Sequence, residues 1–194
     1  MRPDDTLCRC DEQVPDPLAR YAREYAGTLL AGRAADTAHA ETAARQAEAA
    51  AVALRRPKPE MLVAAAHLHD VGRAPSLART GFAPVDAAMD LMAMGWPDPV
   101  VSLVAHQMQA RLIAPVVGAG PEIALISRIQ GWPADILDYA ILTTDPEGGL
   151  RSVDDGLAAV RREQEADARI PARIADERIR RLMRAGYRVR DALA

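Results

Sequence analysis

Aromatic residues and lysine are scarce in this chain of 194 residues. Aromatic residues make up 4% of the sequence, whereas hydrophobic residues of all kinds make up 49%. This balance predicts a core of alanine, leucine, valine, isoleucine and methionine, which is typical of closely packed helices. Of the 24 basic residues only Lys58 is a lysine. The composition favours arginine throughout, so any single arginine is weak evidence of function.

Cysteines and long hydrophobic runs are scarce as well. Cys8 and Cys10 are too close together for an ordinary disulfide and have no second pair with which to form a zinc site. The start lacks the apolar region of a signal peptide, and no apolar run approaches the roughly 20 residues that span a membrane. We therefore expect a cytoplasmic protein that does not bind membranes.

The chain has no excess of positive charge. Its formal net charge of −3 at pH 7 argues against broad affinity for nucleic acids. The helix expected over Ala172–Leu193 is locally rich in arginine, but Ile179 and Leu182 contribute to an apolar side. We expect this helix to pack on its own domain or on a second subunit, in a homodimer.

The hydrophobic pattern is helical. Apolar residues recur three and four positions apart, and few stretches show the two-residue period of a half-buried strand. The sequence therefore predicts a single all-α domain over residues 16–194, after a flexible tail over residues 1–15. A loop is expected over Leu112–Pro121, which contains a Gly-Ala-Gly turn. The expected helices are Pro17–Ala31, Thr37–Leu54, Pro59–His69, Pro84–Met94, Asp98–Ala110, Glu122–Ile129, Ala134–Leu142, Val153–Glu165 and Ala172–Leu193.

Three of the four histidines suggest one site built from several helices. His39 lies near the start of an alanine-rich helix, and His106 follows a later apolar stretch. Between them an apolar run ends in His69 and Asp70 and is closed by Gly72, the usual residue just past a helix end. A buried carboxylate is normally satisfied by hydrogen bonds, a countercharge or a cation. A metal is therefore one of three interpretations of this pair.

One further histidine and the two tryptophans have simpler interpretations. His67 lies two residues before His69 and so points to another side of the helix, where a core histidine bonded to a backbone carbonyl is expected. Trp96 and Trp132 each stand in a Gly-Trp-Pro context and are expected to pack at helix starts. None of the three is assigned to the site.

The chain resembles the HD-domain superfamily of metal-dependent phosphohydrolases, in particular its small bacterial single-domain members, from about Leu30 to Gly149. The matching segments are Ala66–Arg73, Gly81–Leu91, Leu103–His106 and Tyr139–Gly148. The resemblance implies an HD-domain-like compact helical bundle. It also implies that His39, His69 and Asp70 are metal ligands.

The chain departs from the family pattern at two positions. The last metal-binding aspartate of the family falls on Ile141, which cannot bind a metal, and a histidine found in many members falls on Ala83. A two-metal centre is therefore not expected. Asp138 or Asp145 could replace the lost carboxylate, because residues three or four apart share a helix face. The simpler interpretation is that Asp138 is a solvated helix residue and Asp145 a turn residue.

Two classes of function remain open. In the first, His39, His69 and Asp70 hold one Mn, Fe, Zn or Ni ion, with Asp138 or water completing the shell. Arg73 and His106 then orient the phosphate of a small ester or nucleotide. The same ligand types also match a non-haem iron oxygenase.

In the second class the metal is lost. The protein then binds or senses a ligand, or uses His39, His69 and Asp70 as acid–base groups, as a tailoring enzyme of a biosynthetic pathway would. Both classes predict a small-molecule partner, and the first predicts an anionic one.

Overall fold

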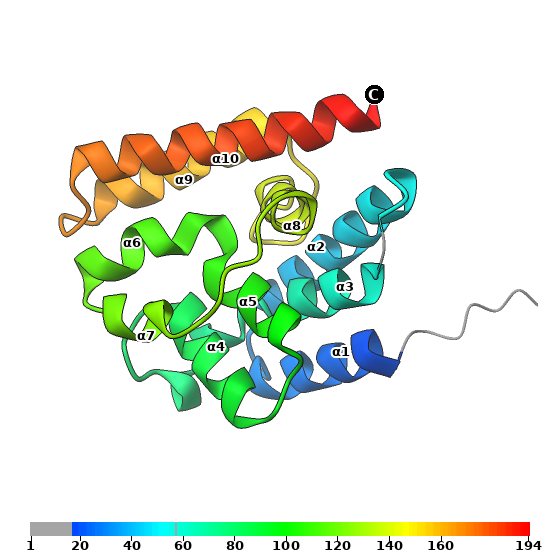
Figure 1. Cartoon of the computed structure of the whole chain (residues 1–194), viewed down its shortest axis with the longest axis horizontal. Helices are drawn as coiled ribbons and strands as arrows, with labels where there is room; N and C mark the ends of the chain where they lie inside the picture. Colours follow the sequence, from blue (N-terminus) through cyan, green and yellow to red (C-terminus); the bar gives the residue numbers. More distant parts are fainter. Residues whose placement is uncertain (1–16, 57) are drawn as a thin grey trace, which may run out of the picture.

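The computed structural model describes residues 17–56 and 58–194 and confirms an all-α fold. Among these residues the β-type pairing is confined to an isolated bridge between Thr144 and Leu150. The expected tail over residues 1–15, with Cys8 and Cys10, lies outside the described residues. Figure 1 shows the helices, which are α1 (Pro17–Leu29), α2 (Ala34–Ala53), α3 (Pro59–Leu68), α4 (Ala83–Ala93), α5 (Asp98–His106), α6 (Ala110–Val117), α7 (Gly120–Ala124), α8 (Trp132–Leu142), α9 (Val153–Ala166) and α10 (Ala172–Leu193).

Short 3₁₀ turns connect some of these helices. They are η1 (Val71–Arg73), η2 (Pro75–Leu77) and η3 (Gln107–Gln109). The helices expected at α1 to α4 and α8 to α10 are confirmed, and their ends lie within three residues of the expected ones. For these elements the hydrophobic period and the proline and glycine signals were sufficient.

The prediction for the segment between α5 and α8 is wrong. The loop expected over Leu112–Pro121 is largely helix α6, and the helix expected over Glu122–Ile129 is reduced to the short α7. Ala114, from α6, is buried in a small apolar cluster together with Val85 and Ile123. This packing outweighs the cost of Pro115 inside α6, because tertiary contacts routinely override local propensity.

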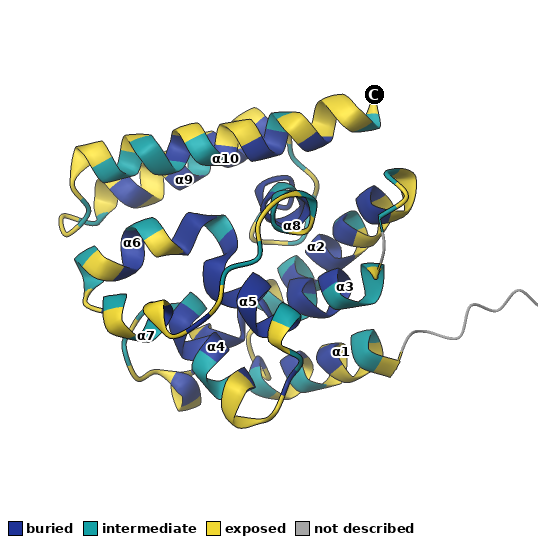
Figure 2. Ribbon diagram, in the orientation of Figure 1, coloured by how far each residue is buried: buried dark blue, intermediate teal, exposed yellow. Residues whose placement is uncertain are grey.

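The central layer consists of helices with small buried side chains. The buried face of α2 is almost entirely alanine, at positions 40, 43, 44, 47, 50 and 51. Small side chains let a neighbouring helix approach closely, and α3 packs against α2 along this face. Figure 2 shows this region and α5 largely in the dark blue of buried residues. The packing sets the start of α2 beside the end of α3, where the candidate site residues lie.

The chain bends sharply between α5 and α6. Met108 and Gln109 have positive φ angles of 48° and 58°, so the helix expected to continue to Ala110 ends at His106. Within the described residues, Asp98–Val117 is the one helical stretch apolar and long enough to cross a membrane by composition. The bend interrupts that stretch, and 61% of the qualifying window is buried within the fold.

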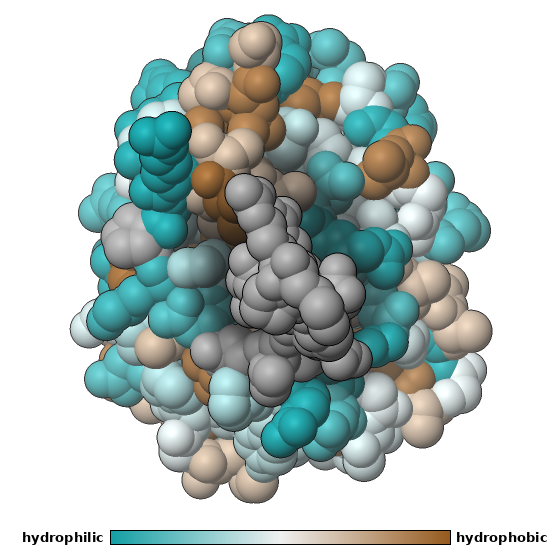
Figure 3. Space-filling model, turned by 90° about the vertical axis from the view of Figure 1, so that its right-hand side faces the viewer, coloured by the Kyte–Doolittle hydropathy of each residue, from teal (hydrophilic) through white to brown (hydrophobic). Residues whose placement is uncertain are grey.

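Helices α9 and α10 form a hairpin along one side of the molecule, and α8 lies between this hairpin and α2 (Figure 1). The apolar side of α10, including Ile179, Leu182 and Val189, is buried against its own chain. Arg188 also forms an ion pair with Asp135 of α8 at 2.5 Å. Because the apolar side of α10 is already covered by its own chain, a second subunit is not needed to cover it. Figure 3 shows one face of the molecule, on which hydrophobic residues gather mainly toward the upper part, among hydrophilic ones.

Candidate metal centre

His39, His69 and Asp70 form a cluster where the start of α2 meets the end of α3. One potential ligand atom from each lies within 4.8 Å of the other two. His69 is 2% and Asp70 8% exposed, whereas His39 is partly buried. The sequence predicted this convergence, and the packing of α2 on α3 produces it.

Backbone carbonyls fix the orientation of both imidazole rings. The Nδ1 atom of His39 lies 2.8 Å from the carbonyl oxygen of Asp145, and Nδ1 of His69 lies 2.7 Å from that of Ala66. A carbonyl oxygen only accepts, so each Nδ1 carries a proton, and Nε2 is the nitrogen of each ring that is left to bind a metal ion. Burial and the neighbouring His69 lower the pKa of His39, which favours its neutral form.

The third member, Asp70, is an ionised carboxylate. Burial opposes its ionisation, but the neighbouring His69 and Arg73 lower its pKa. One oxygen, Oδ1, accepts a hydrogen bond from Nε of Arg73 at 2.8 Å, and Oδ2 lies 3.5 Å from Nε2 of His69. Arg73 therefore neutralises the carboxylate from outside and leaves Oδ2 facing the ring.

Two ring nitrogens and a carboxylate oxygen thus lie close together, and all three are acceptors once neither Nε2 atom carries a proton. In the described part of the chain the buried Nε2 atom of His69 has no hydrogen-bond partner. A buried acceptor without a partner is costly, and converging acceptors repel one another unless a cation or a proton donor lies between them. Two imidazole nitrogens and a carboxylate oxygen, with the rings held through Nδ1, match the ligands preferred by Zn, Fe and Mn. The donor set therefore fits a divalent metal ion.

Asp138 lies elsewhere, which corrects both expectations for it. It is 2% exposed, so it is not a solvated helix residue. Its oxygens accept hydrogen bonds from the backbone N–H of Met108 at 2.6 Å and from Nε2 of Gln109 at 2.9 Å. Both oxygens are therefore used at the bend between α5 and α6, and Asp138 does not complete the ligand set. Its burial raises its pKa to about 6.

Asp145 is a turn residue, as the simpler interpretation predicted. Its Oδ1 atom accepts hydrogen bonds from the N–H groups of Glu147 and Gly149, at 3.0 and 2.7 Å. The residue serves the site through its backbone carbonyl, which holds His39. Ile141 lines the cavity beside the cluster, so no carboxylate occupies that position.

His106 does not join the cluster. Its Nε2 atom donates a hydrogen bond to the carbonyl oxygen of Ile126 at 3.0 Å, and burial lowers its pKa. It is absent from the lining of the cavity that contains His39 and His69. The expectation that His106 orients a substrate phosphate is therefore corrected, because its ring is turned toward the loop after α7.

A cavity of about 620 Å³ opens beside the cluster. Ala83, at the start of α4, contributes only a methyl group where the family resemblance implies a histidine. The close approach of α4 depends on Gly72, because a Cβ atom there would lie 1.9 Å from the carbonyl oxygen of Ala83. Gly72 has this role and does not end the helix with a positive φ angle. Arg73 also lines the cavity, and its contact with an anionic substrate stays a prediction.

Two cavity residues were missed by the sequence analysis. Arg151 donates through Nε to the carbonyl oxygen of Leu142, and Arg178 of α10 donates through Nε to that of Met108, both at 2.8 Å. Neither guanidinium forms an ion pair with a carboxylate of the described residues, and burial lowers the pKa of each. No local signal distinguishes these two arginines in a chain that is rich in arginine.

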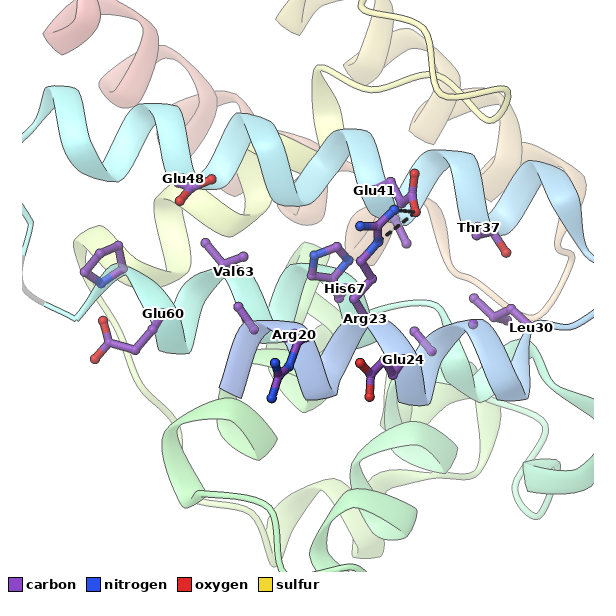
Figure 4. Close-up of a pocket in the computed structure, with 15 residues that line it drawn as sticks. Arg20, Arg23, Glu24, Leu30, Thr37, Glu41, Glu48, Glu60, Val63 and His67 are labelled. Carbon is purple, nitrogen blue, oxygen red and sulfur yellow. Dashed lines mark hydrogen bonds and ion pairs between the residues drawn. The ribbon is translucent and has the colours of Figure 1, made fainter. Parts of the chain in front are cut away.

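A second cavity, of about 880 Å³, lies between α1, α2 and α3 (Figure 4). His67 lines it, which confirms that this ring points to another side of α3 than His69. Arg23 crosses the cavity to pair with Glu41 at 2.8 Å. Burial is the main cause that lowers the pKa of His67 to about 4, and the positive charge of Arg23 is the second. His67 therefore lines this cavity as a neutral ring, and the expected place in the core is corrected.

Both tryptophans pack away from the cluster, as predicted. Trp96 is 6% exposed and stacks on Tyr21, with ring centroids 5.0 Å apart. The guanidinium groups of Arg56 and Arg188 each lie over the ring of Trp132, at 4.2 and 4.1 Å from its centroid. Neither ring lines the cavity beside His39.

Comparison with known proteins adds no relative to this description. No family model matches the sequence, and no curated protein or solved structure matches it. The functional argument therefore depends on the residues and their geometry.

Proposed function

We propose that this chain is an HD-domain-like hydrolase that acts on a small phosphate ester or nucleotide through one metal ion. The observation that carries the proposal is the cluster of His39, His69 and Asp70, in which two ring nitrogens are turned toward a carboxylate by backbone carbonyls. The order along the chain supports it, because a histidine on one helix precedes a His-Asp pair at the end of the next.

The ligands would be Nε2 of His39, Nε2 of His69 and a carboxylate oxygen of Asp70. A bound Mn, Fe, Zn or Ni ion would supply a water molecule of lowered pKa and a Lewis acid for a phosphoryl oxygen. Arg73 holds Asp70 in place, and half of its side chain is exposed at the cavity, where it can also contact an anionic substrate. With Ala83 in the lining, one ion and not two is proposed.

A metal-free function is the second candidate, and Ile141 is the observation that favours it. This apolar residue lines the cavity at the position of the family's fourth ligand. In that case the neutral ring of His39 or His69, held by a backbone carbonyl, acts as the general base on an organic substrate or binds a ligand.

The deciding experiment is elemental analysis by mass spectrometry of protein purified without a chelator. We expect near-stoichiometric metal in the parent and background metal in His39→Ala and His69→Ala. His67→Ala is the matched control, because His67 lines the other cavity, and it should retain the metal. A screen of phosphate esters and nucleotides with the retained ion then tests hydrolysis.

Background metal in the parent after reconstitution with Mn, Fe and Zn would exclude the hydrolase and favour the metal-free candidate. Retained iron with oxygen-dependent turnover would instead indicate the oxygenase that shares this ligand type. The cytoplasmic location, the absence of nucleic-acid binding and the homodimer remain predictions from the sequence.

A further inference from the structure

Gln164 of α9 is a buried side chain with unused hydrogen-bonding capacity. It lines the cavity beside the metal cluster and is only 3% exposed. Its Nε2 atom has no hydrogen-bond partner among the described residues. A buried amide N–H without an acceptor is costly, so such a group in a cavity wall indicates that something else accepts from it.

Arg178 determines which end of the Gln164 amide is the donor. Its NH1 atom lies 3.4 Å from Oε1 of Gln164, while its Nε atom donates to the carbonyl oxygen of Met108 at 2.8 Å. A guanidinium group only donates, so the atom that faces it must be the amide oxygen. The amide nitrogen, with its two N–H bonds, is therefore the end left without an acceptor.

We propose that Gln164 and Arg178 together form a binding site for an oxyanion, the phosphate or carboxylate group of a ligand that occupies this cavity. An amide N–H and a guanidinium N–H that lie side by side offer the donors that an oxyanion prefers. Arg178 forms no direct ion pair within the described residues, although the nearby carboxylates of Glu163 and Asp138 act on its charge, so its guanidinium can still donate to an anion. Arg151 lines the same cavity and adds a second positive charge that forms no direct ion pair within the described residues, although Asp145 and Asp155 act on it from nearby.

This inference names the part of the chain that selects the substrate, and in that respect it rests on the proposed function. The resemblance to the HD-domain superfamily ends near Gly149, before α9 and α10 begin. The cluster would carry out the reaction, and the hairpin would recognise an anionic group of the substrate. Binding of an anion at Gln164 and Arg178 does not itself require a metal, so the two proposals are tested separately.

The test is calorimetric titration of the full chain with inorganic phosphate and, in a second arm, with acetate. The protein is first freed of metal with a chelator and dialysed. The variants are Gln164→Glu, which replaces the donor by a carboxylate that Arg178 can still hold, and Arg178→Met. The matched controls are Gln130→Glu and Arg184→Met, at exposed positions outside the cavity lining.

We expect phosphate to bind the parent and both controls, and binding to weaken at least about tenfold in each cavity variant. The arm with the larger affinity identifies the oxyanion as phosphate or carboxylate. Thermal unfolding confirms that each variant folds. If Arg178→Met does not fold, Gln164→Glu is sufficient for the test.

The possible outcomes separate the two proposals. Equal phosphate affinity in the parent and in Gln164→Glu would overturn the inference, and so would no binding of either anion to the parent. The metal hydrolase would stand in both cases if elemental analysis finds the ion. Loss of anion binding in the cavity variants, with metal at background, would support the anion site and reject the hydrolase.

Discussion

Asp138 shows at the scale of one residue how a buried carboxylate can serve a bend and not a metal. Its two oxygens accept from Met108 and Gln109, both of which have positive φ angles. Burial raises its pKa from 3.8 to about 6, so the folded state holds a proton that the unfolded state has already lost between these pH values. The free energy of unfolding therefore falls as pH rises from about 4 to about 6.

We predict that Asp138→Asn removes this pH dependence. A pKa difference of about two pH units corresponds to about 3 kcal/mol, so the difference in unfolding free energy between the variant and the parent should change by up to that amount from pH 4 to pH 7. The amide keeps one of the two acceptors, so the variant also loses one hydrogen bond, at a cost that does not depend on pH. Urea unfolding curves at several pH values in this range measure it. Asp176→Asn, at an exposed position, controls for the loss of one negative charge. Parallel stability profiles for parent and Asp138→Asn would contradict the assignment.

The site residues that the sequence predicted are those fixed by local order. His69 and Asp70 are adjacent, and His39 lies near the start of the helix that packs on theirs, so their convergence needs only the contact of α2 with α3. The directions of Asp138 and His106 depend on the bend after α5 and on the carbonyl of Ile126. No local pattern encodes these distant contacts, so neither residue could be placed from the sequence.

At the scale of the elements, replacing either of two glycines by alanine should change the stability of the protein in opposite directions. A Cβ atom at Gly72 would lie 1.9 Å from the carbonyl oxygen of Ala83, so Gly72→Ala must push α4 away from the turn that carries Asp70 and Arg73. We expect a loss of stability of about 1–3 kcal/mol, the usual cost of overpacking. At Gly27, in α1, an added Cβ would meet nothing within 4 Å. Gly27→Ala should therefore stabilise the protein by about 0.5–1 kcal/mol.

Chemical denaturation of both variants beside the parent measures this contrast. The two substitutions add the same methyl group, so the sign of the change reports the surroundings of each glycine. A stabilising Gly72→Ala would show that α4 is not held where the structure places it.

The helices themselves were easier to predict than the segments that join them. In α10 the apolar residues recur over the whole length, and its bounds matched the expected ones. In α6 the signals conflict, because Pro115 and Gly118 indicate a break whereas Ile113 and Ala114 are buried. The free energy of burial outweighs the break signals in this segment. Which residues of α6 are buried depends on its packing against α4, and the local sequence does not contain that information.

At the scale of the whole molecule, the proposed ion should act on stability as well as on chemistry. His39 belongs to α2 and His69 follows α3, so a bound ion connects two helices of the core. Metal at about 100 times its Kd stabilises the folded state by about 2.7 kcal/mol. For a chain of this size the midpoint of thermal unfolding should rise by roughly 5–10 °C.

Thermal scans of chelated and metal-loaded protein test this expectation without a substrate. His39→Ala should abolish the increase, whereas His67→Ala should retain it, since His67 lines the separate cavity between α1 and α3. An equal increase in His39→Ala would place the stabilising ion at a different site.

The carbonyl of Asp145 has a consequence for natural variation. His39 is held by a backbone oxygen, and Thr42, one turn later on α2, donates to the backbone oxygen of Gly148 in the same turn at 2.9 Å. Every amino acid carries the same carbonyl, so the contact with the ring does not itself require aspartate. The turn does require an acceptor for the N–H groups of Glu147 and Gly149, which Asn or Ser could also supply. Gly148 is more constrained, because its φ is 85° and a Cβ atom would lie 2.8 Å from the carbonyl oxygen of Ala38. Among natural variants of this chain, the glycine should therefore be retained more strictly than the aspartate that holds the ring.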